Sequence, residues 1–290
     1  MASFEEEENT SQLYYDSDDA FNFYRHVWGG AHIHIGMYDG VNSTGIERII
    51  EASEQSLERV FAKIEENSTY LLSGVSQVMD MGSAYGGSAR TCARKYGCQV
   101  TCIDISSREN ARNRELSKKE ELEHLIRIPG DLSYCDTGME SESFDVVYSM
   151  DSFLHAGCLR EKVVEEAARV LKPGALFVFT DIMQTDTASV DQLQPVYDRL
   201  QLVDMGSLRQ YREWGSRYNL QFVSFDDQSQ QLAEHYCEVM KNLEGMREAL
   251  SGKVSEEFVK KMAQGLEAWV ETTQEGSDLM AWGVLTFKKK

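Results

Sequence analysis

The chain has 290 residues, of which 42% are hydrophobic and 10% aromatic, enough for a buried core, and this excludes a largely disordered protein. Its net charge of −19 argues against nucleic acid as a partner, because a field this negative repels phosphate backbones. No apolar run approaches the roughly 18 residues that a membrane span requires, so we expect no membrane association.

The chain starts with an acidic segment that lacks the basic and apolar regions of a signal peptide, which predicts a cytoplasmic location. The six cysteines show no CxxC or Cys/His spacing typical of zinc, so we expect reduced thiols and no metal. A monomer and a homodimer are both compatible with the sequence.

Two helices are predicted ahead of the first strand. Residues 18–28 place Phe21, Tyr24 and Trp28 at helical spacing. Thr44 followed by Glu47 has the spacing of a capping box and precedes a strongly amphipathic segment. Both helices would come before the sheet begins.

Strand and helix patterns alternate from residue 77 onward. The predicted strands are 78–81, 99–105, 125–128, 144–150 and 175–181, and the predicted helices between them are 84–94, 107–120 and 161–171. Such alternation predicts a parallel sheet with helices on both faces, and ligands of such sheets bind at the carboxyl ends of the strands.

The alternation weakens after residue 181. Residues 183–218 and 229–273 are mainly helical, and strands are predicted at 220–225 and 280–287. This layout is typical of a final hairpin split by a helical insertion. We therefore expect an α/β protein with a Rossmann-like core.

The first strand ends in a glycine-containing turn, Asp80-Met81-Gly82-Ser83-Ala84-Tyr85-Gly86. Gly82 and Gly86 allow the backbone to turn tightly and approach a ligand, while the next helix offers free N–H groups. The turn lacks the GxGxxG phosphate fingerprint and so suits a nucleoside without a pyrophosphate. An ordinary strand-to-helix turn is the alternative.

Acidic residues end the next two strands. Asp104 has the position from which a carboxylate accepts both ribose hydroxyls. Asp131 closes the third strand, where a carboxylate could bind an adenine amino group.

Together with Phe144-Asp145-Val146-Val147-Tyr148 and Leu171-Lys172-Pro173-Gly174, these acids resemble the class I S-adenosylmethionine-dependent methyltransferases. The segments 14–21, 23–30 and 33–36 are similar to sarcosine/dimethylglycine N-methyltransferases and more distantly to phosphoethanolamine methyltransferases. The resemblance implies a seven-stranded, mostly parallel sheet with the last strand antiparallel. It also implies methyl transfer from S-adenosylmethionine, leaving S-adenosylhomocysteine, to sarcosine or dimethylglycine on the way to the osmolyte glycine betaine.

The expected organisation has two parts. Residues 1–70 would form a helical cap over the active site, and residues 71–290 the Rossmann-like methyltransferase core, with helical insertions near 183–218 and 229–278.

The phosphoethanolamine relatives have a Tyr before the first helix and a His after the fourth strand that close over the substrate amine, with an Asp four residues before the His. Asp151 and His155 match that pattern, as does either Tyr14 or Tyr15. Tyr15 is favoured as the third catalytic residue because it directly precedes the acidic start of the helix. Met150 replaces an Arg of those relatives, so their phosphate-handling network is not implied.

The resemblance also indicates residues that bind the cofactor and the substrate. The expected cofactor contacts are Tyr24, Trp28, His34, Gly82, Ser83, Gly86, Asp104, Ile105, Asp131, Leu132 and Met150. The substrate carboxylate requires a cation, for which residues 183–218 offer Arg199, Arg209, Arg212 and Arg217. Arg199 aligns with a phosphate-reading Arg of the relatives, and with Tyr197 it is the predicted substrate contact.

Other interpretations stay open at this point. His155 and Asp151 could serve as helix caps, and Tyr24 and Trp28 could be ordinary core residues. The acceptor could be another small amine, a phosphoethanolamine-type base or a carbon of a sterol or tocopherol ring. A non-catalytic protein that binds S-adenosylmethionine is the alternative from another class.

Overall fold

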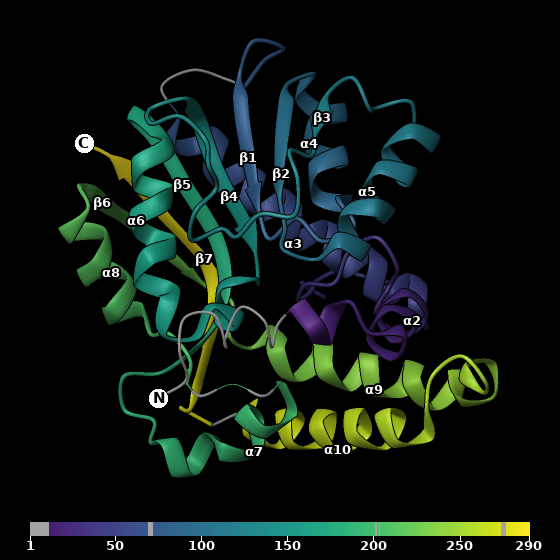
Figure 1. Ribbon diagram of the computed structural model, residues 1–290. Helices are drawn as coiled ribbons and strands as arrows, with labels where there is room; N and C mark the ends of the chain where they lie inside the picture. The colour runs from purple at the N-terminus through teal and green to yellow at the C-terminus, as the bar shows by residue number, and fades with distance from the viewer. Residues whose placement is uncertain (1–11, 69–71, 201, 203, 274–276) are drawn as a thin grey trace.

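The centre of the protein is a seven-stranded sheet (Figure 1). The computed structural model describes residues 12–68, 72–200, 202, 204–273 and 277–290. The strands are β1 (Gln77–Met81), β2 (Gln99–Ile103), β3 (Ile126–Arg127), β4 (Phe144–Met150), β5 (Leu171–Gln184), β6 (Leu220–Asp227) and β7 (Met280–Lys289).

The strand order is β3-β2-β1-β4-β5-β7-β6. The first five strands in this order pair in parallel, whereas β7 is antiparallel to both β5 and β6. The predicted fold is therefore confirmed, including the antiparallel last strand and the hairpin into which helices are inserted. Because β7 runs against its neighbours, it starts at the edge where the parallel strands end.

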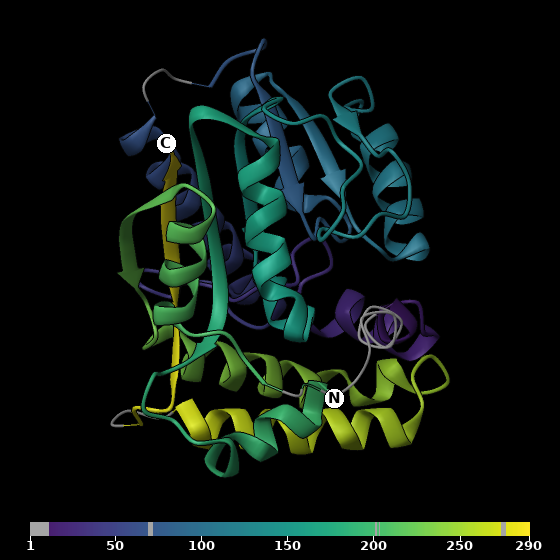
Figure 2. The same cartoon turned by 60° about the vertical axis from the view of Figure 1, so that its left-hand side comes forward.

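Helices cover both faces of the sheet and its carboxyl edge (Figures 1 and 2). They are α2 (Asp18–Val27), α3 (Ile46–Asn67), α4 (Gly87–Tyr96), α5 (Ser107–Lys119), η1 (Phe153–Leu159), α6 (Arg160–Val170), α7 (Val190–Leu200), α8 (Leu208–Arg217), α9 (Gln231–Leu250) and α10 (Glu256–Thr273). On one face α3 packs against β5 and β7, and on the other α6 packs against β5 and α8. The antiparallel pair α9 and α10 lies with α2 beside the carboxyl ends of the parallel strands.

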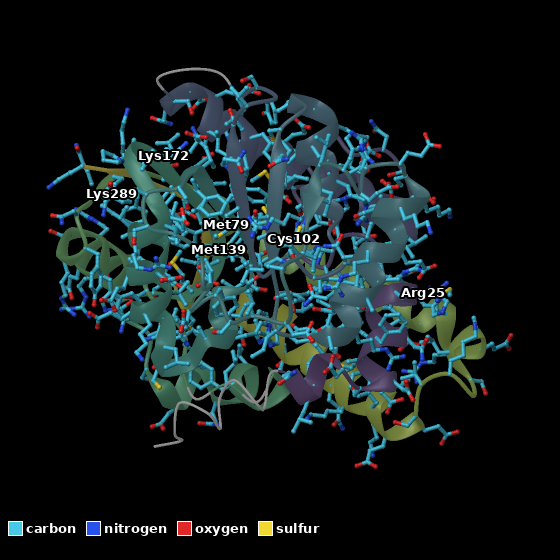
Figure 3. All side chains as sticks on the ribbon, turned by 45° about the horizontal axis from the view of Figure 1, so that its top comes forward. Arg25, Met79, Cys102, Met139, Lys172 and Lys289 are labelled. Carbon is cyan, nitrogen blue, oxygen red and sulfur yellow. The ribbon has the colours of Figure 1, made fainter. Side chains whose placement is uncertain are left out.

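Successive side chains along the central strands point alternately into two hydrophobic cores, one on each face of the sheet. Val78 belongs to the core shared with α3, whereas the next residue, Met79, belongs to the core shared with α6. The strand period of two residues explains this division. Figure 3 shows Met79 and Cys102 toward the middle of the molecule and Arg25, Lys172 and Lys289 toward its rim.

Three local expectations differ from the structure. Helix α3 is capped by Gly45 without a side-chain hydrogen bond, so Thr44 and Glu47 do not form the expected capping box. Helix α4 begins at Gly87 rather than at residue 84, because Ala84 and Gly86 both have positive φ. Strand β5 already includes Leu171, so Lys172-Pro173-Gly174 lies at the start of the strand rather than before it.

None of the helices in the described part of the chain is both long enough and apolar enough to cross a membrane.

Candidate functional site

One cavity of about 990 Å³, including its open mouth, lies at the carboxyl edge of the sheet. Its walls come from the segment that precedes β1, from the loops after β1, β2, β3 and β4, from β5, and from α4, α5 and α9. Of the predicted cofactor contacts, Tyr24, Trp28, His34, Gly82, Ser83, Asp104, Ile105 and Met150 line it. The predicted catalytic residues Tyr15, Asp151 and His155 line the same cavity.

Glycine is required at three positions in and directly after the turn that follows β1. A Cβ on Gly82, whose φ is +74°, would lie 2.2 Å from Ser152 Oγ in the loop after β4. A Cβ on Gly87 would lie 2.2 Å from the carbonyl oxygen of Ala31. The glycines therefore let two neighbouring loops close around this turn. Gly86, with φ +71°, does not line the cavity and faces Asn113.

Asp104 is fixed at the end of β2 by backbone donors. Ala84 N donates to its Oδ2 at 2.8 Å, and Ser106 N donates to its Oδ1 at 2.9 Å. The side chain is 7% exposed, and burial raises the pKa of its carboxyl. The carboxylate is thus anchored while one side of it still borders the cavity.

Asp131 and Leu132 support this region without lining the cavity. Asn110 Nδ2 donates to Asp131 Oδ1 at 2.9 Å, and Leu132 N donates to the Asp104 carbonyl at 2.9 Å. These two residues hold the loop after β3 against the end of β2.

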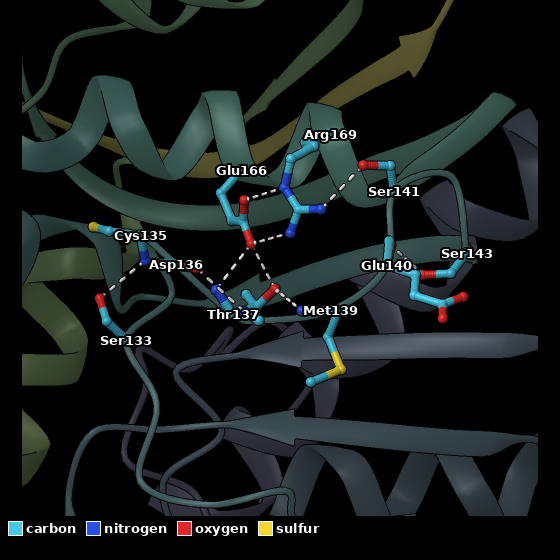
Figure 4. A network of polar contacts seen from close by, with 11 residues as sticks. Ser133, Cys135, Asp136, Thr137, Met139, Glu140, Ser141, Ser143, Glu166 and Arg169 are labelled. Atoms are coloured by element: carbon cyan, nitrogen blue, oxygen red, sulfur yellow. Dashed lines mark hydrogen bonds and ion pairs between the residues drawn. The ribbon is translucent and has the colours of Figure 1, made fainter.

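That loop is tied to α6 by the network in Figure 4. Thr137 N donates to Glu166 Oε1 at 2.8 Å, and Arg169 reaches the same carboxylate through Nε at 2.7 Å. Arg169 also donates to Ser141 Oγ at 3.1 Å, so α6 fixes the second half of the loop. The anchored loop carries Tyr134, whose side chain lines the cavity.

Tyr15 and His155 meet at the cavity wall. The Tyr15 hydroxyl lies 2.8 Å from His155 Nε2, and the two rings pack edge to face with centroids 5.3 Å apart. Burial raises the pKa of the Tyr15 hydroxyl well above its usual value, so the phenol stays protonated and donates to Nε2 in the imidazole tautomer that carries its proton on Nδ1. Tyr14 instead lies with its hydroxyl 3.2 Å from that of Tyr24. Of the two adjacent tyrosines, Tyr15 is the one beside the histidine.

Asp151 begins the loop after β4 and has a left-handed backbone, with φ +52°. Ile35 N donates to its Oδ2 at 2.8 Å, and Trp282 Nε1 donates to its Oδ1 at 2.7 Å. Burial raises the pKa of the Asp151 carboxyl to about 6. The group is therefore ionised at neutral pH and held by two N–H donors.

His32 and His34 form a buried pair on the segment before α3. Nε2 of His34 lies 3.3 Å from Nδ1 of His32. Burial lowers the pKa of His32 to about 4 and that of His34 to about 3, so both rings are neutral at physiological pH. The pair supplies polar but uncharged groups to the cavity.

The predicted carboxylate-binding residues are not brought to this cavity within the described side chains. The side chain of Arg199 lies outside what the structure describes. Tyr197 is buried elsewhere, and its hydroxyl donates to Gln184 Oε1 at 2.8 Å. The other candidate arginines, Arg209, Arg212 and Arg217, lie on α8 and pair with Asp186, the Phe222 ring and Glu161.

Several residues that line or support the cavity escaped the sequence analysis: His32, Glu109, Tyr134, Tyr236 and Trp282. Glu109 could have been singled out from the sequence, since Ser106 and Glu109 have the spacing of a capping box. Ser106 does cap α5, but its own N–H goes to Asp104, which leaves the Glu109 carboxyl near the cavity. Trp282 carried no local signal, because it sits in an apolar strand.

The chain is similar to known methyltransferases. A family model described as a methyltransferase domain matches residues 79–179. A glycine/sarcosine/dimethylglycine N-methyltransferase of Actinopolyspora halophila is 43% identical over 277 residues, covering 96% of this chain but 46% of that protein. A sarcosine/dimethylglycine N-methyltransferase of Halorhodospira halochloris is 39% identical over 280 residues, covering 97% and 96%.

A solved structure from Galdieria sulphuraria, described as that of a sarcosine dimethylglycine methyltransferase, superimposes with a TM-score of 0.83. It is 33% identical and covers 94% of this chain and 98% of its own. The chain thus spans less than half of the Actinopolyspora protein and nearly all of the other two.

Proposed function

Because the chain belongs to the sarcosine/dimethylglycine N-methyltransferase family, we propose that it methylates the nitrogen of sarcosine and dimethylglycine and forms glycine betaine, with S-adenosylmethionine as donor. The observation that carries the proposal is the Tyr15–His155 hydrogen bond of 2.8 Å in the cavity that Asp104 and Gly82 also line. The Tyr15–His155 pair, which can accept a proton, thus lies in the same cavity as Asp104 and Gly82, which suit a nucleoside.

The residues present fit the proposed donor. Asp104 offers an anchored carboxylate for the ribose hydroxyls, and Gly82 leaves room for close backbone contact. Glu109 Oε1 is buried and has no hydrogen-bond partner among the described residues, which leaves a polar atom for a ligand. When bound, S-adenosylmethionine supplies a methyl group that is already activated on a sulfonium.

The chain's own task is to deprotonate and orient the amine. At neutral pH the substrate arrives mostly as an ammonium ion, which has no lone pair for attack. We infer that its proton passes to the Tyr15 oxygen while the Tyr15 hydroxyl proton passes to His155 Nε2. The positive charge then rests on the imidazole, and the free amine keeps its place in the cavity.

Asp151 and the aromatic walls suit a cationic nitrogen. The Asp151 carboxylate supplies the negative charge, and Tyr24, Trp28 and Tyr236 supply ring faces that attract quaternary ammonium groups. None of the described residues that line the cavity is Lys or Arg. Arg199, on α7, remains the proposed partner of the substrate carboxylate.

The proposed cap consists of residues 1–70. Its support is that Tyr15, Trp28 and His34 line the cavity from this segment, whereas Gly82 and Asp151 line it from the rest of the chain. In this arrangement the segment would exclude water from the amine.

The test is methyl transfer from labelled S-adenosylmethionine to glycine, sarcosine, dimethylglycine and phosphoethanolamine, with products identified by mass. We expect betaine from dimethylglycine and little product from phosphoethanolamine. Tight binding of S-adenosylhomocysteine with none of these acceptors methylated would overturn the substrate and leave the cofactor site standing. Product from phosphoethanolamine or from a sterol alone would replace the substrate class.

A further inference from the structure

Asp151 receives hydrogen bonds from two segments far away in the sequence. Ile35 N lies in the segment between α2 and α3, and Trp282 Nε1 lies on β7, the antiparallel strand. Thr180, on β5, accepts from the Asp151 backbone N–H through its hydroxyl and its carbonyl, both at 3.1 Å. Three segments thus converge on one carboxyl-bearing residue.

The side chain of Trp282 is fully buried, so its N–H has no access to water. An indole N–H donates and never accepts, and it therefore stabilises an ionised carboxylate more than a neutral acid. The backbone N–H of Ile35 acts in the same sense on the other oxygen. In this site burial raises the pKa of the Asp151 carboxyl, whereas the Thr180 hydroxyl and the two N–H donors lower it.

Among the neighbouring groups, Thr180 on β5 also favours the negative charge of Asp151, through its hydroxyl. The charge of Asp151 in turn raises the pKa of Asp181 on the same strand, so the two carboxylates repel each other. His155 on η1, His34 beside Ile35 and Tyr236 on α9 line the same cavity. No Lys or Arg is among the described residues that line it, so hydrogen bonds from Thr180, Ile35 and Trp282 hold the charge in place of a cation.

We propose that Trp282 is a positioning residue that keeps Asp151 ionised and aims its carboxylate into the cavity. Through Trp282, strand β7 thereby favours the negative charge of Asp151, which faces the cationic nitrogen of the substrate. This inference rests on the proposed function only in naming the amine as the partner of Asp151. The effect of Trp282 on Asp151 itself does not depend on the substrate.

The test is Trp282→Phe, which removes the N–H and keeps a buried ring. The matched control is Trp214→Phe on α8, whose ring packs edge to face on Tyr211 and does not line the cavity. Carbon-13 NMR of the Asp carboxyls, with Asp151 assigned through Asp151→Asn, should show its titration shifted upward by about one pH unit in Trp282→Phe. Trp214→Phe should leave it unchanged.

Kinetics give an independent measure. In Trp282→Phe the acid limb of the pH profile of kcat/KM should shift upward with the titration, and activity should recover at high pH. In an Asp151→Asn background, Trp282→Phe should cause no further shift. An unchanged titration of Asp151, or a loss of activity that is equal at every pH, would overturn the proposal.

The wild-type protein supplies a measurement for the case in which Trp282→Phe does not fold. The indole N–H signal that Trp282 gives in nitrogen-15 NMR should move as the pH passes through the Asp151 titration. If none of the indole signals follows that titration, the proposal fails. An enzyme that methylates none of the four acceptors but retains this coupling would refute the proposed function alone.

Discussion

Replacing Tyr15 by Phe removes one hydroxyl and keeps the packing of the ring. The ring contacts His155 at 5.3 Å and Tyr24 at 5.7 Å between centroids, and Phe retains both contacts. The lost hydrogen bond is worth about 1 kcal/mol of stability. The midpoint of thermal unfolding should therefore fall by only about 2–4 °C.

The loss of activity should be much larger. Positioned proton transfer contributes roughly 10²–10⁴-fold to rates, so kcat for dimethylglycine should fall by about 100-fold or more in Tyr15→Phe. The assay is betaine formation by mass at saturating S-adenosylmethionine, together with calorimetric binding of S-adenosylhomocysteine, which should change little.

Tyr14→Phe is the matched control. Tyr14 is the adjacent residue, its hydroxyl lies near that of Tyr24 rather than His155, and it does not line the cavity. We expect it to keep kcat within a few-fold of wild type. Equal losses in the two variants, or a loss below about tenfold in Tyr15→Phe, would refute the assignment of proton transfer to the Tyr15–His155 pair.

Three further predictions follow from buried groups. Asp104→Asn should weaken binding of S-adenosylhomocysteine by about 10–100-fold in calorimetry. The reason is that an amide cannot accept hydrogen bonds from both Ala84 N and Ser106 N, as the Asp104 carboxylate does. Unchanged affinity would contradict the role of Asp104 in binding the cofactor. Gly82→Ala should destabilise the protein by about 1–3 kcal/mol, because alanine is strained at the positive φ of this position. The clash of the new Cβ with Ser152 should add a further cost, which the second substitution Ser152→Gly should remove. A Gly82→Ala variant with the thermal stability of the wild type would refute this prediction. Burial raises the pKa of Asp181 to about 7. Between about pH 4 and about pH 7 the Asp181 carboxyl is therefore protonated in the folded protein and ionised in the unfolded chain. The free energy of unfolding should then fall as the pH rises through this range. In Asp181→Asn the unfolding midpoint should fall less over that range, and an identical pH dependence would exclude Asp181 as the cause.

The order of strands and helices could be predicted from the sequence because burial leaves a periodic mark. The alternation from residue 77 onward, the turn at Gly82 and the acid at Asp104 are all local patterns. Parallel topology then places the ends of the strands at one edge of the sheet, so Gly82, Asp104 and Asp151 had to lie near one another.

Local patterns were insufficient where turn geometry or long-range packing decided the outcome. Thr44 and Glu47 have the right spacing for a capping box, but the chain starts α3 after Gly45 instead. Asp131 follows its strand as expected, yet Asn110 holds its carboxylate outside the cavity lining. The spacing of residues along the sequence does not show which hydrogen-bond partner a side chain has in the folded protein.

The sequence by itself determined the class of fold, the edge of the sheet that binds ligands and the identity of most groups at that edge. Only the tertiary structure decided between Tyr14 and Tyr15, because adjacent residues of a helical turn point in different directions and just one reaches His155. It alone brought Trp282 to Asp151. A tryptophan in an apolar strand gives the same sequence pattern whether or not its indole N–H meets a carboxylate. The contact depends on the long-range pairing of β7 with β5.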